Sequence, residues 1–325
     1  MTTRRDFLSL AGGLAAAGLV TPAYAQAWPQ KPVIIAVPFA PGGNTDGIAR
    51  MIAQRLTEKL GQQFVVENKV GAGGALAADI VARAQPDGYT LFVTAVSVLT
   101  IVPKMMKVKY DPAKDFAPIS NIATNPFVLI VHKDVPVRSV EEFIAYAKAR
   151  KDALSYASAG QGSLSHLAMA LFLKQAGIEM THVPYKGNAP ALADVVAGHV
   201  PAMFSNLSDA LPQMAGGNVR AIAVSGDKRA VQAPDVPTVA ESGYPAYKAL
   251  TWNGLVAPAG TPKEIIDKVA KVVADASKDP VFAQKLATYG VDPLGNTPEE
   301  FAKMIRDDIV TWAAALQAAG ITQVQ

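Results

Sequence analysis

The sequence predicts an α/β protein with two lobes, each built on a mostly parallel sheet that is flanked by helices. Short apolar runs alternate with helical patterns from Trp28 to about Asn125, and a second alternation of the same kind begins near Leu154. Strand–helix–strand alternation implies right-handed crossovers and an open, largely parallel sheet. Roughly 300 residues follow the N-terminal segment, which is enough for two domains of the usual size. We therefore expect a cleft between two lobes, and ligands bind where strand ends meet such a cleft.

The elements of the first unit follow from its apolar runs and from helical spacing. Its expected strands are 33–37, 64–67, 90–94 and 127–132. Uninterrupted apolar runs of this length are typical of strands that are buried on both faces. Its expected helices are 46–60 and 74–84, and the first repeats apolar residues every four positions at Ile48, Ile52, Leu56 and Leu60. Ser139, with Glu142 three residues later, forms a capping box that predicts another helix start.

The second unit repeats this pattern and is followed by two amphipathic helices. Its expected strands are 154–157, 180–184, 202–205 and 220–225, and its expected helices are 163–176 and 189–197. The C-terminal helices are expected at 262–276 and 297–319, the second with Thr297 as its cap and a proline at its first helical position. Their inward faces are expected to be Ile265, Ile266, Val269, Val272 and Val273 in the first helix, and Phe301, Ile305, Ile309, Trp312 and Leu316 in the second.

The turn after the first strand is the first candidate for a binding site. Its glycine pair places no side chain between the backbone and a ligand. Asn44, Thr45 or Asp46 would cap the helix that follows, and the free N–H groups at a helix start attract anions. No basic residue lies between Pro38 and Gly47, so we expect an anion there to be held by dipoles and not by ions. The candidate residues are Phe39, Pro41, Gly42, Gly43, Asn44, Thr45 and Asp46.

A second turn of the same kind lies between the strand at 154–157 and the helix at 163–176. It contains glycines and hydroxyls but no acidic or basic residue. Two such turns, one from each lobe, would grip the two ends of a dianion, although each turn taken alone is equally consistent with a plain helix-starting loop. Because an exposed helix terminus contributes only about 0.3–1 kcal/mol, several donors must add together. The candidate residues are Ser158, Ala159, Gly160, Gly162, Ser163 and His166.

Two further turns add candidates from the second unit. Tyr185 would cover a ligand, and Lys186, next to Gly187, would offer positive charge, although a loop lysine is commonly solvated. Asn206 lies in a fourth turn, at 204–209. We expect these residues to lie at the cleft as well.

The N-terminus has the pattern of an export signal, so we exclude it from the fold. Arg4 and Arg5 precede an apolar stretch at 10–20, which is shorter than the about 20 residues that a spanning helix needs. Small residues allow cleavage near Ala25 or Ala27. We therefore expect residues 1–27 to be a twin-arginine-like signal peptide and the mature protein to be a soluble protein of the periplasm.

Composition and missing motifs exclude several other functions. The chain has no cysteine, which excludes disulfides and thiolate sites, and its net charge of +3 falls to +2 without residues 1–25. So small a bias does not predict binding to nucleic acid or to an anionic membrane. No phosphate-binding loop ends in Gly-Lys-Ser/Thr, residues 71–74 lack the third glycine of a dinucleotide site, and the four histidines lack metal-site spacing. We expect no cofactor and no metal. Without a Gly-x-Ser-x-Gly motif, an exported hydrolase that uses Ser163 and His166 remains only an alternative.

Eight segments in chain order carry a family resemblance. They are Trp28-Pro29 with Lys31-Pro32, PFAPGG at 38–43 with Asp46, ENK with GAGG at 67–74, PDGYTL at 86–91, YDP with KDF at 110–116, VPYKG at 183–187, PDVPT at 234–238 and APAGTP at 257–262. In these segments the chain resembles the Bug-type (TctC-type) extracytoplasmic solute receptors of tripartite tricarboxylate transporters. The resemblance implies a type II periplasmic-binding-protein fold that closes on its ligand, with small carboxylates as ligands and membrane transporter subunits as partners.

The resemblance also implies an arrangement of the site. We expect residues 28–125 and 226–325 to form the first lobe, residues 126–225 to form the second, and the chain to be a monomer without enzymatic activity. The first lobe would contribute 39–46 and Ser97. The second lobe would contribute 158–163, His166, 185–187 and Asn206.

One departure from the family pattern bears on the ligand. Many relatives have an acidic residue where this chain has Ser205, directly before Asn206. Its loss argues against a ligand with an amino group and favours a plain mono-, di- or tricarboxylate. The apolar residues Val96, Val98 and Leu99 near the first lobe's cleft edge would also accept an aromatic body. A ligand sensor for a membrane signalling partner stays a second interpretation, because it needs the same closing cleft.

Overall fold

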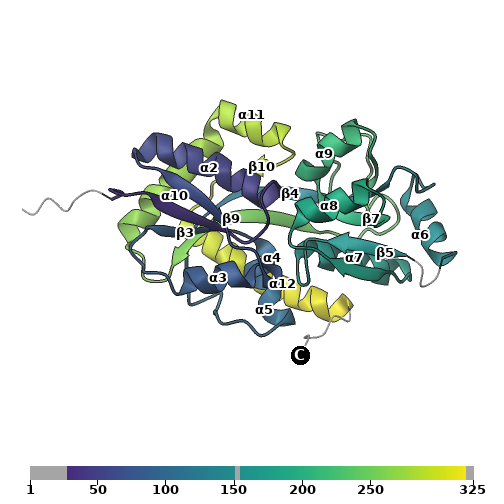
Figure 1. Ribbon diagram of the computed structural model, residues 1–325, viewed down its shortest axis with the longest axis horizontal. Helices are drawn as coiled ribbons and strands as arrows, with labels where there is room; N and C mark the ends of the chain where they lie inside the picture. The colour runs from purple at the N-terminus through teal and green to yellow at the C-terminus, as the bar shows by residue number, and fades with distance from the viewer. Residues whose placement is uncertain (1–27, 151–153, 320–325) are drawn as a thin grey trace, which may run out of the picture.

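The structure of the protein is a computed structural model, and it describes residues 28–150 and 154–319. The strands of these residues are β1 (Val33–Val37), β2 (Phe64–Asn68), β3 (Thr90–Ala95), β4 (Phe116–His132), β5 (Ser155–Ser158), β6 (Thr181–Pro184), β7 (Ala202–Asn206), β8 (Val219–Val224), β9 (Leu250–Pro258) and β10 (Asp292–Pro293). They pair in the order β2-β1-β3-β9-β4-β7-β5-β6, with β10 and β8 also joined to β4. Figure 1 shows that this path forms two lobes side by side. The lobe that contains β1 is the first lobe, and the lobe that contains β5 is the second.

Helices cover the sheets in both lobes. The helices of the first lobe are α2 (Asn44–Leu60), the 3₁₀ turn η1 (Ala72–Gly74), α3 (Ala75–Ala82), α4 (Val96–Thr100), α5 (Val102–Met105), α10 (Lys263–Lys278), α11 (Pro280–Thr288) and α12 (Pro298–Ala319). Those of the second lobe are α6 (Val140–Lys148), α7 (Leu164–Ala176), α8 (Asn188–Val196) and α9 (Leu207–Ala215). The predicted α/β fold with two lobes is therefore confirmed.

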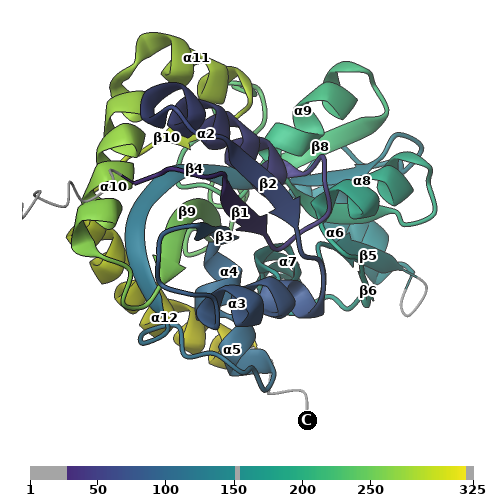
Figure 2. The same ribbon diagram turned by 60° about the vertical axis from the view of Figure 1, so that its left-hand side comes forward.

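The first lobe is a mixed sheet between two helical layers. Strand β1 lies between β2 and β3, all three are parallel, and β9 is antiparallel to β3. Helices α2, α10 and α11 pack on one face, and α3, α4, α5 and α12 pack on the other, as Figure 2 shows. The predicted apolar stripe of α2 is confirmed at Ile48, Ile52 and Leu56, which have no exposed surface.

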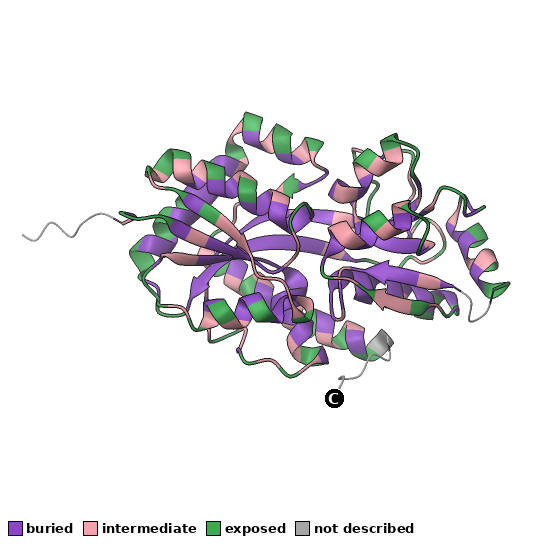
Figure 3. Ribbon diagram, in the orientation of Figure 1, coloured by how far each residue is buried: buried purple, intermediate pink, exposed green. Residues whose placement is uncertain are grey.

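The second lobe repeats this design on a smaller scale. Strand β5 lies between β6 and β7 in parallel, while β4 runs antiparallel to β7 and β8. Helices α6 and α7 pack on one face, and α8 and α9 pack on the other. Ser139 caps α6 by accepting the N–H of Glu142 at 3.1 Å, as the capping box predicts. The central strands of both lobes are buried, while the outer helices alternate between buried and exposed residues (Figure 3).

Strand β4 passes from one lobe into the other. Its first part pairs with β9 as far as Pro126, and residues from Phe127 onward pair with β7 and β8. The sequence predicts only 127–132 of this 17-residue strand, because Pro118, Pro126 and several polar residues interrupt the apolar pattern before it. Pro118 stands at a register shift, where a missing N–H is tolerated.

The sequence also did not predict β9, β10, α4, α5, α9 and α11. Strand β9 contains Asn253 and Gly254, which break its apolar run, and Gly254 is needed because a Cβ there would lie 2.0 Å from the ring of Phe301. Helix α9 carries Pro212 in its interior, so its sequence resembles a turn more than a helix.

The expected lobe boundaries at 125/126 and 225/226 stay a prediction. Tyr247, which follows the second boundary, stacks on Phe204 of β7 with ring centroids 5.8 Å apart and donates to the carbonyl of Ala168 at 2.9 Å. The expected signal peptide, residues 1–27, lies outside the described residues. Within the described ranges, no helix has both the length and the apolarity to cross a membrane.

Candidate functional site

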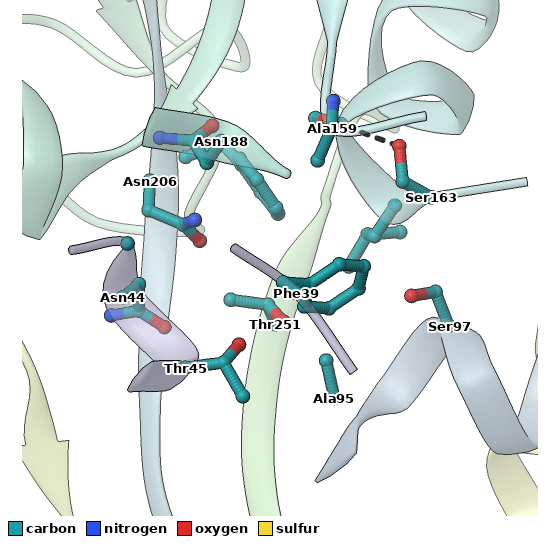
Figure 4. A pocket seen from close by; sticks show the side chains of 14 residues that line it. Phe39, Asn44, Thr45, Ala95, Ser97, Ala159, Ser163, Asn188, Asn206 and Thr251 are labelled. Atoms are coloured by element: carbon teal, nitrogen blue, oxygen red, sulfur yellow. Dashed lines mark hydrogen bonds between the residues drawn. The ribbon is translucent and has the colours of Figure 1, made fainter. Parts of the chain in front are cut away.

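A cavity of about 40 Å³ lies between the lobes, where strands of both sheets end. Figure 4 shows side chains from both lobes converging on it, with the hydroxyls of Thr45 and Ser97 turned toward its interior. Its lining residues are Phe39, Gly43, Asn44, Thr45, Ala95, Ser97, Phe127, Ala159, Ser163, Leu164, Ser165, Asn188, Asn206 and Thr251. None of these side chains is ionisable, so the cavity can recognise charge only through dipoles, hydroxyls, amides and backbone N–H groups.

Helix α2 begins at the wall that the first lobe contributes. Its N-cap is Gly43, which has an extended backbone and no side chain to cap the helix, whereas the sequence predicts a cap at residues 44–46. The N–H of Gly47 makes the first helical bond, to Gly43 at 3.0 Å. The N–H groups of Thr45 and Asp46 have no acceptor among the described residues. They are therefore free to donate to an anion in the cavity.

Asn44 is the first helical residue of α2 and connects the two lobes. Its side-chain Nδ2 donates to Ser208 Oγ at 2.8 Å, and its N–H donates to Asp209 Oδ2 at 3.2 Å, both in the second lobe. Its Oδ1 accepts from Asn253 Nδ2 at 2.8 Å. These bonds hold the lobes together beside the cavity, so the protein is in a closed form.

Helix α7 begins at the opposite wall. Ser163 caps it by accepting the N–H of His166 at 3.3 Å, and Ser165 Oγ accepts the N–H of Ala159 at 2.9 Å. The N–H groups of Leu164 and Ser165 find no acceptor in the part of the chain that the structure describes. Free helix N–H groups from both lobes thus meet at one cavity.

A stacked pair of histidines supports this second turn from behind. The rings of His166 and His182 lie 4.0 Å apart and nearly parallel, His166 Nδ1 accepts from the N–H of Gly162 at 3.4 Å, and His182 Nε2 lies 2.6 Å from Ser158 Oγ. Burial, together with the charge that His182 would carry, lowers the pKa of His166 to about 3, and burial lowers that of His182 to about 4. Both rings are therefore neutral at neutral pH.

The contact between Ser163 and His166 is not that of a nucleophile and its base. Ser163 Oγ contacts the backbone N–H of His166, and the imidazole packs on His182. A general base works best with a pKa near the operating pH, and about 3 is far below it.

Asn188 and Asp209 form a polar network that the sequence did not single out. Asp209 Oδ2 accepts from Asn188 Nδ2 at 2.6 Å and from Asn206 Nδ2 at 3.5 Å, besides the N–H of Asn44. Burial of the carboxylate outweighs these hydrogen bonds and raises its pKa to about 6. Asp209 as a whole residue is partly exposed, because it also borders an outer groove next to Tyr289. The only sequence signal was position: Asn188 follows Gly187, and Asp209 ends the fourth turn.

The expected site residues divide into two groups. Those that line the cavity are Phe39, Gly43, Asn44, Thr45, Ser97, Ala159, Ser163 and Asn206. Those that lie outside its lining are Pro41, Gly42, Asp46, Ser158, Gly160, Gly162, His166, Tyr185, Lys186 and Gly187. Lining residues that the sequence missed are Ala95, Phe127, Leu164, Ser165, Asn188 and Thr251.

Other partners explain why several expected residues lie elsewhere. Burial tends to raise the pKa of Asp46, but hydrogen bonds from Arg50, Gly42 and Asn68 outweigh it and hold the pKa below its usual range. Arg50 lies 2.9 Å from this carboxylate, which therefore stabilises the turn from outside the cavity. The hydroxyl of Tyr185 donates to Asp194 at 2.5 Å and so does not cover the cavity.

Glycines at the contact between the lobes let the two backbones meet. The carbonyl of Lys186 accepts the N–H of Ala40 at 3.3 Å, and a Cβ on Gly187 would lie 3.1 Å from the nitrogen of Ala40. A Cβ on Gly73 would lie 2.5 Å from the carbonyl oxygen of Gln161. A side chain at either glycine would hold the lobes apart.

Solved structures resemble the whole chain. The R. palustris protein Rpa4515, solved with adipate, is 37% identical and superimposes with a TM-score of 0.90 over 92% of this chain and 100% of its own. The periplasmic binding protein BugD is 36% identical, with a TM-score of 0.88 over 91% of this chain and 100% of its own. MatC from Rhodopseudomonas palustris, with bound malate, is 34% identical, with a TM-score of 0.85 over 89% of this chain and 100% of its own.

Sequence comparison leads to the same group. Protein BugT of Bordetella pertussis is 35% identical over 309 residues, which cover 94% of this chain and 95% of BugT. The family model of the tripartite tricarboxylate transporter family receptor, TctC, matches residues 48–321. The chain therefore belongs to the TctC family of tripartite tricarboxylate transporter receptors, the group of the Bug-type solute-binding proteins.

Proposed function

We propose that this chain is an exported receptor that captures a small mono-, di- or tricarboxylate between its lobes for the membrane subunits of a tripartite tricarboxylate-type transporter. One observation carries the proposal: helices α2 and α7 begin at the same cavity from opposite lobes, and no lining side chain is ionisable. Helix N-termini attract anions through their free N–H groups and their dipoles. A carboxylate, with two oxygens that each accept several hydrogen bonds, suits such a site.

The free N–H groups of the two helix starts set the scale of the affinity. A hydrogen bond to a charged group contributes about 1.5–3 kcal/mol, so the free N–H groups of Thr45, Asp46, Leu164 and Ser165 would together contribute about 6–12 kcal/mol. A dissociation constant of about 1 μM corresponds to about 8 kcal/mol. Association itself costs about 4–15 kcal/mol, so the hydroxyls of Ser97 and Thr251 would have to add to these N–H groups.

The relatives support the ligand class. Adipate in Rpa4515 and malate in MatC are both dicarboxylates. An extended dicarboxylate would place one carboxylate at α2 and the other at α7.

We propose binding without catalysis. Ser163, the alternative nucleophile, serves as the cap of α7, and the imidazole of His166 is too weakly basic to activate it. The closed form, held by the bonds of Asn44 to Ser208 and Asp209, would be the surface that a membrane partner recognises. Residues 1–27 would direct the chain to the periplasm and be removed near Ala25 or Ala27.

Native mass spectrometry and calorimetry test this proposal. We expect the purified mature chain to release one small carboxylate on denaturation, or to bind succinate, malate, adipate or benzoate with one ligand per chain. Succinamide, which has the shape of succinate without its charge, is the matched control and should not bind. If no carboxylate is released and none of the four acids binds, the proposal is wrong. A covalent adduct on Ser163 would favour the hydrolase instead.

A further inference from the structure

Three asparagine side chains near the cavity have a buried amide oxygen without a partner among the described residues: Asn125, Asn188 and Asn253. Of these, only Asn188 belongs to the cavity lining. It is 5% exposed, and in Figure 4 its amide oxygen lies on the side nearer to Ala159, with the nitrogen turned away. A buried acceptor without a donor is unfavourable, so the site is incomplete without a group that donates to it.

The orientation of this amide is fixed by charge. Asn188 Nδ2 lies 2.6 Å from Asp209 Oδ2 and 2.9 Å from Ser205 Oγ. A flipped amide would place Oδ1 at the same short distance from the carboxylate, where two acceptors repel each other. Asp209 therefore holds the Asn188 nitrogen away from the cavity and leaves Oδ1 as the free end.

The neighbouring amides of the described residues do not supply the missing donor. Asn206 directs its Nδ2 toward Asp209 and its Oδ1 accepts from Asn125, while Asn44 donates to Ser208. Each of these amide nitrogens has a second hydrogen, but neither lies within hydrogen-bond distance of Asn188 Oδ1.

We propose that Asn188 is a specificity-determining residue that selects carboxylates bearing a hydrogen-bond donor, a hydroxyl or an ammonium group, over the same carboxylates without one. This inference rests on the proposed function, since the free N–H groups of α2 and α7 would hold the carboxylate, while Asn188 Oδ1 would accept a hydrogen bond from the substituent. Asp209 acts as a positioning residue, because it touches Asn188 and is not part of the cavity lining.

A matched ligand series tests the proposal by calorimetry on the mature chain at pH 7.5. Glutarate carries no substituent, 2-hydroxyglutarate (both enantiomers) and 3-hydroxyglutarate carry a donor, 2-oxoglutarate carries only an acceptor, and glutamate carries an ammonium group. We expect one hydroxyglutarate or glutamate to bind about 10- to 100-fold more tightly than glutarate, and 2-oxoglutarate to bind no better than glutarate. Ser205, which stands where many relatives have an acidic residue, argues against an amino group in the ligand, so the comparison of the hydroxyl and ammonium arms tests that expectation as well.

Two variants separate the role of the amide orientation from general damage to the site. In Asp209→Asn the new amide can donate to Asn188 Oδ1, so Asn188 can turn its nitrogen toward the ligand, and we expect the preference to shift toward 2-oxoglutarate. Ser205→Ala is the matched control: it removes the other partner of Asn188 Nδ2 but leaves Asp209 in place, so the preference for a donor should persist.

The outcomes distinguish the two proposals. If glutarate, succinate and adipate bind but the donor-bearing acids bind no more tightly, the role of Asn188 is refuted and the carboxylate receptor stands. Circular dichroism establishes whether Asp209→Asn is folded. If the folded variant still prefers the donor-bearing acids as the parent does, the positioning role of Asp209 is refuted. If no carboxylate of any kind binds, the proposed function fails and this inference fails with it.

Discussion

Replacing Leu164 with proline removes one N–H group from the start of α7 without changing its backbone. Leu164 is the first helical residue, and Ser163 before it has φ −66° and ψ 156°, the extended conformation that a residue preceding proline prefers. Proline is well accepted at the first helical position. The variant therefore deletes a donor that, in our proposal, contacts the carboxylate.

The magnitude follows from a matched pair of variants. The Leu164 side chain is 3% exposed, so its loss alone costs about 2–5 kcal/mol of stability. Leu164→Ala loses the same packing but keeps the N–H. The difference between the two variants isolates one hydrogen bond to a charged group, about 1.5–3 kcal/mol, and the proline variant should bind about 10- to 150-fold more weakly than the alanine variant.

Calorimetry with the tightest carboxylate of the panel measures this difference. Far-UV circular dichroism and thermal unfolding of both variants, without ligand, establish that they are folded to the same extent. Affinities within twofold of each other would show that the N-terminus of α7 does not hold the anion, and the argument from converging helix N-termini would then be refuted.

Two further predictions concern stability and closure. Burial lowers the pKa of His166 to about 3, so the unfolded chain takes up this proton first as the pH falls. The contribution of His166 to stability is therefore present above about pH 6.5 and decreases below it, by about 2 kcal/mol at pH 5. Urea unfolding at pH 8 and pH 5 measures this loss, and a His166→Gln variant that loses as much would contradict it. Gly73→Ala should weaken carboxylate binding about 10-fold or more, because its Cβ would lie 2.5 Å from the carbonyl of Gln161 across the cleft. Gly61, with a similar positive φ and open space around it, is the matched control, and Gly61→Ala should bind the carboxylate as tightly as the parent in calorimetry. Equal affinities of Gly73→Ala and Gly61→Ala would show that the contact between Gly73 and Gln161 is not needed for closure.

Local patterns predicted the elements that depend on local chemistry. Strand β1 has the expected bounds of residues 33–37, and α10 buries all five of its expected inward residues. The glycine turns of both lobes contribute residues to the cavity lining. Their positions in the chain could be predicted because the end of a strand and the start of a helix depend on residues that are close together in the sequence. The prediction that Asn44, Thr45 or Asp46 caps α2 was wrong. Gly43 caps the helix, and Asn44 contacts Ser208 in the other lobe instead.

The polar network behind the cavity could not be predicted in the same way. Asn44, Asn188 and Asp209 lie far apart in the chain and meet only through tertiary contacts. The turn at residues 185–187 was expected to supply a lid and a charge, but the hydroxyl of Tyr185 is bonded to Asp194 one helix away. Nothing in the spacing of such residues reveals which partner each will choose.

The strand β4 and the helix α12 have a mechanical consequence. Strand β4 belongs to both sheets, and α12 packs on α4 of the first lobe and on α7 of the second. Each lobe has a buried cluster of its own, and a third cluster spans both lobes. Relative rotation of the lobes would therefore bend a shared strand and shift this shared packing. We expect this shared packing to limit the range of lobe angles, which would leave a membrane partner few shapes to distinguish.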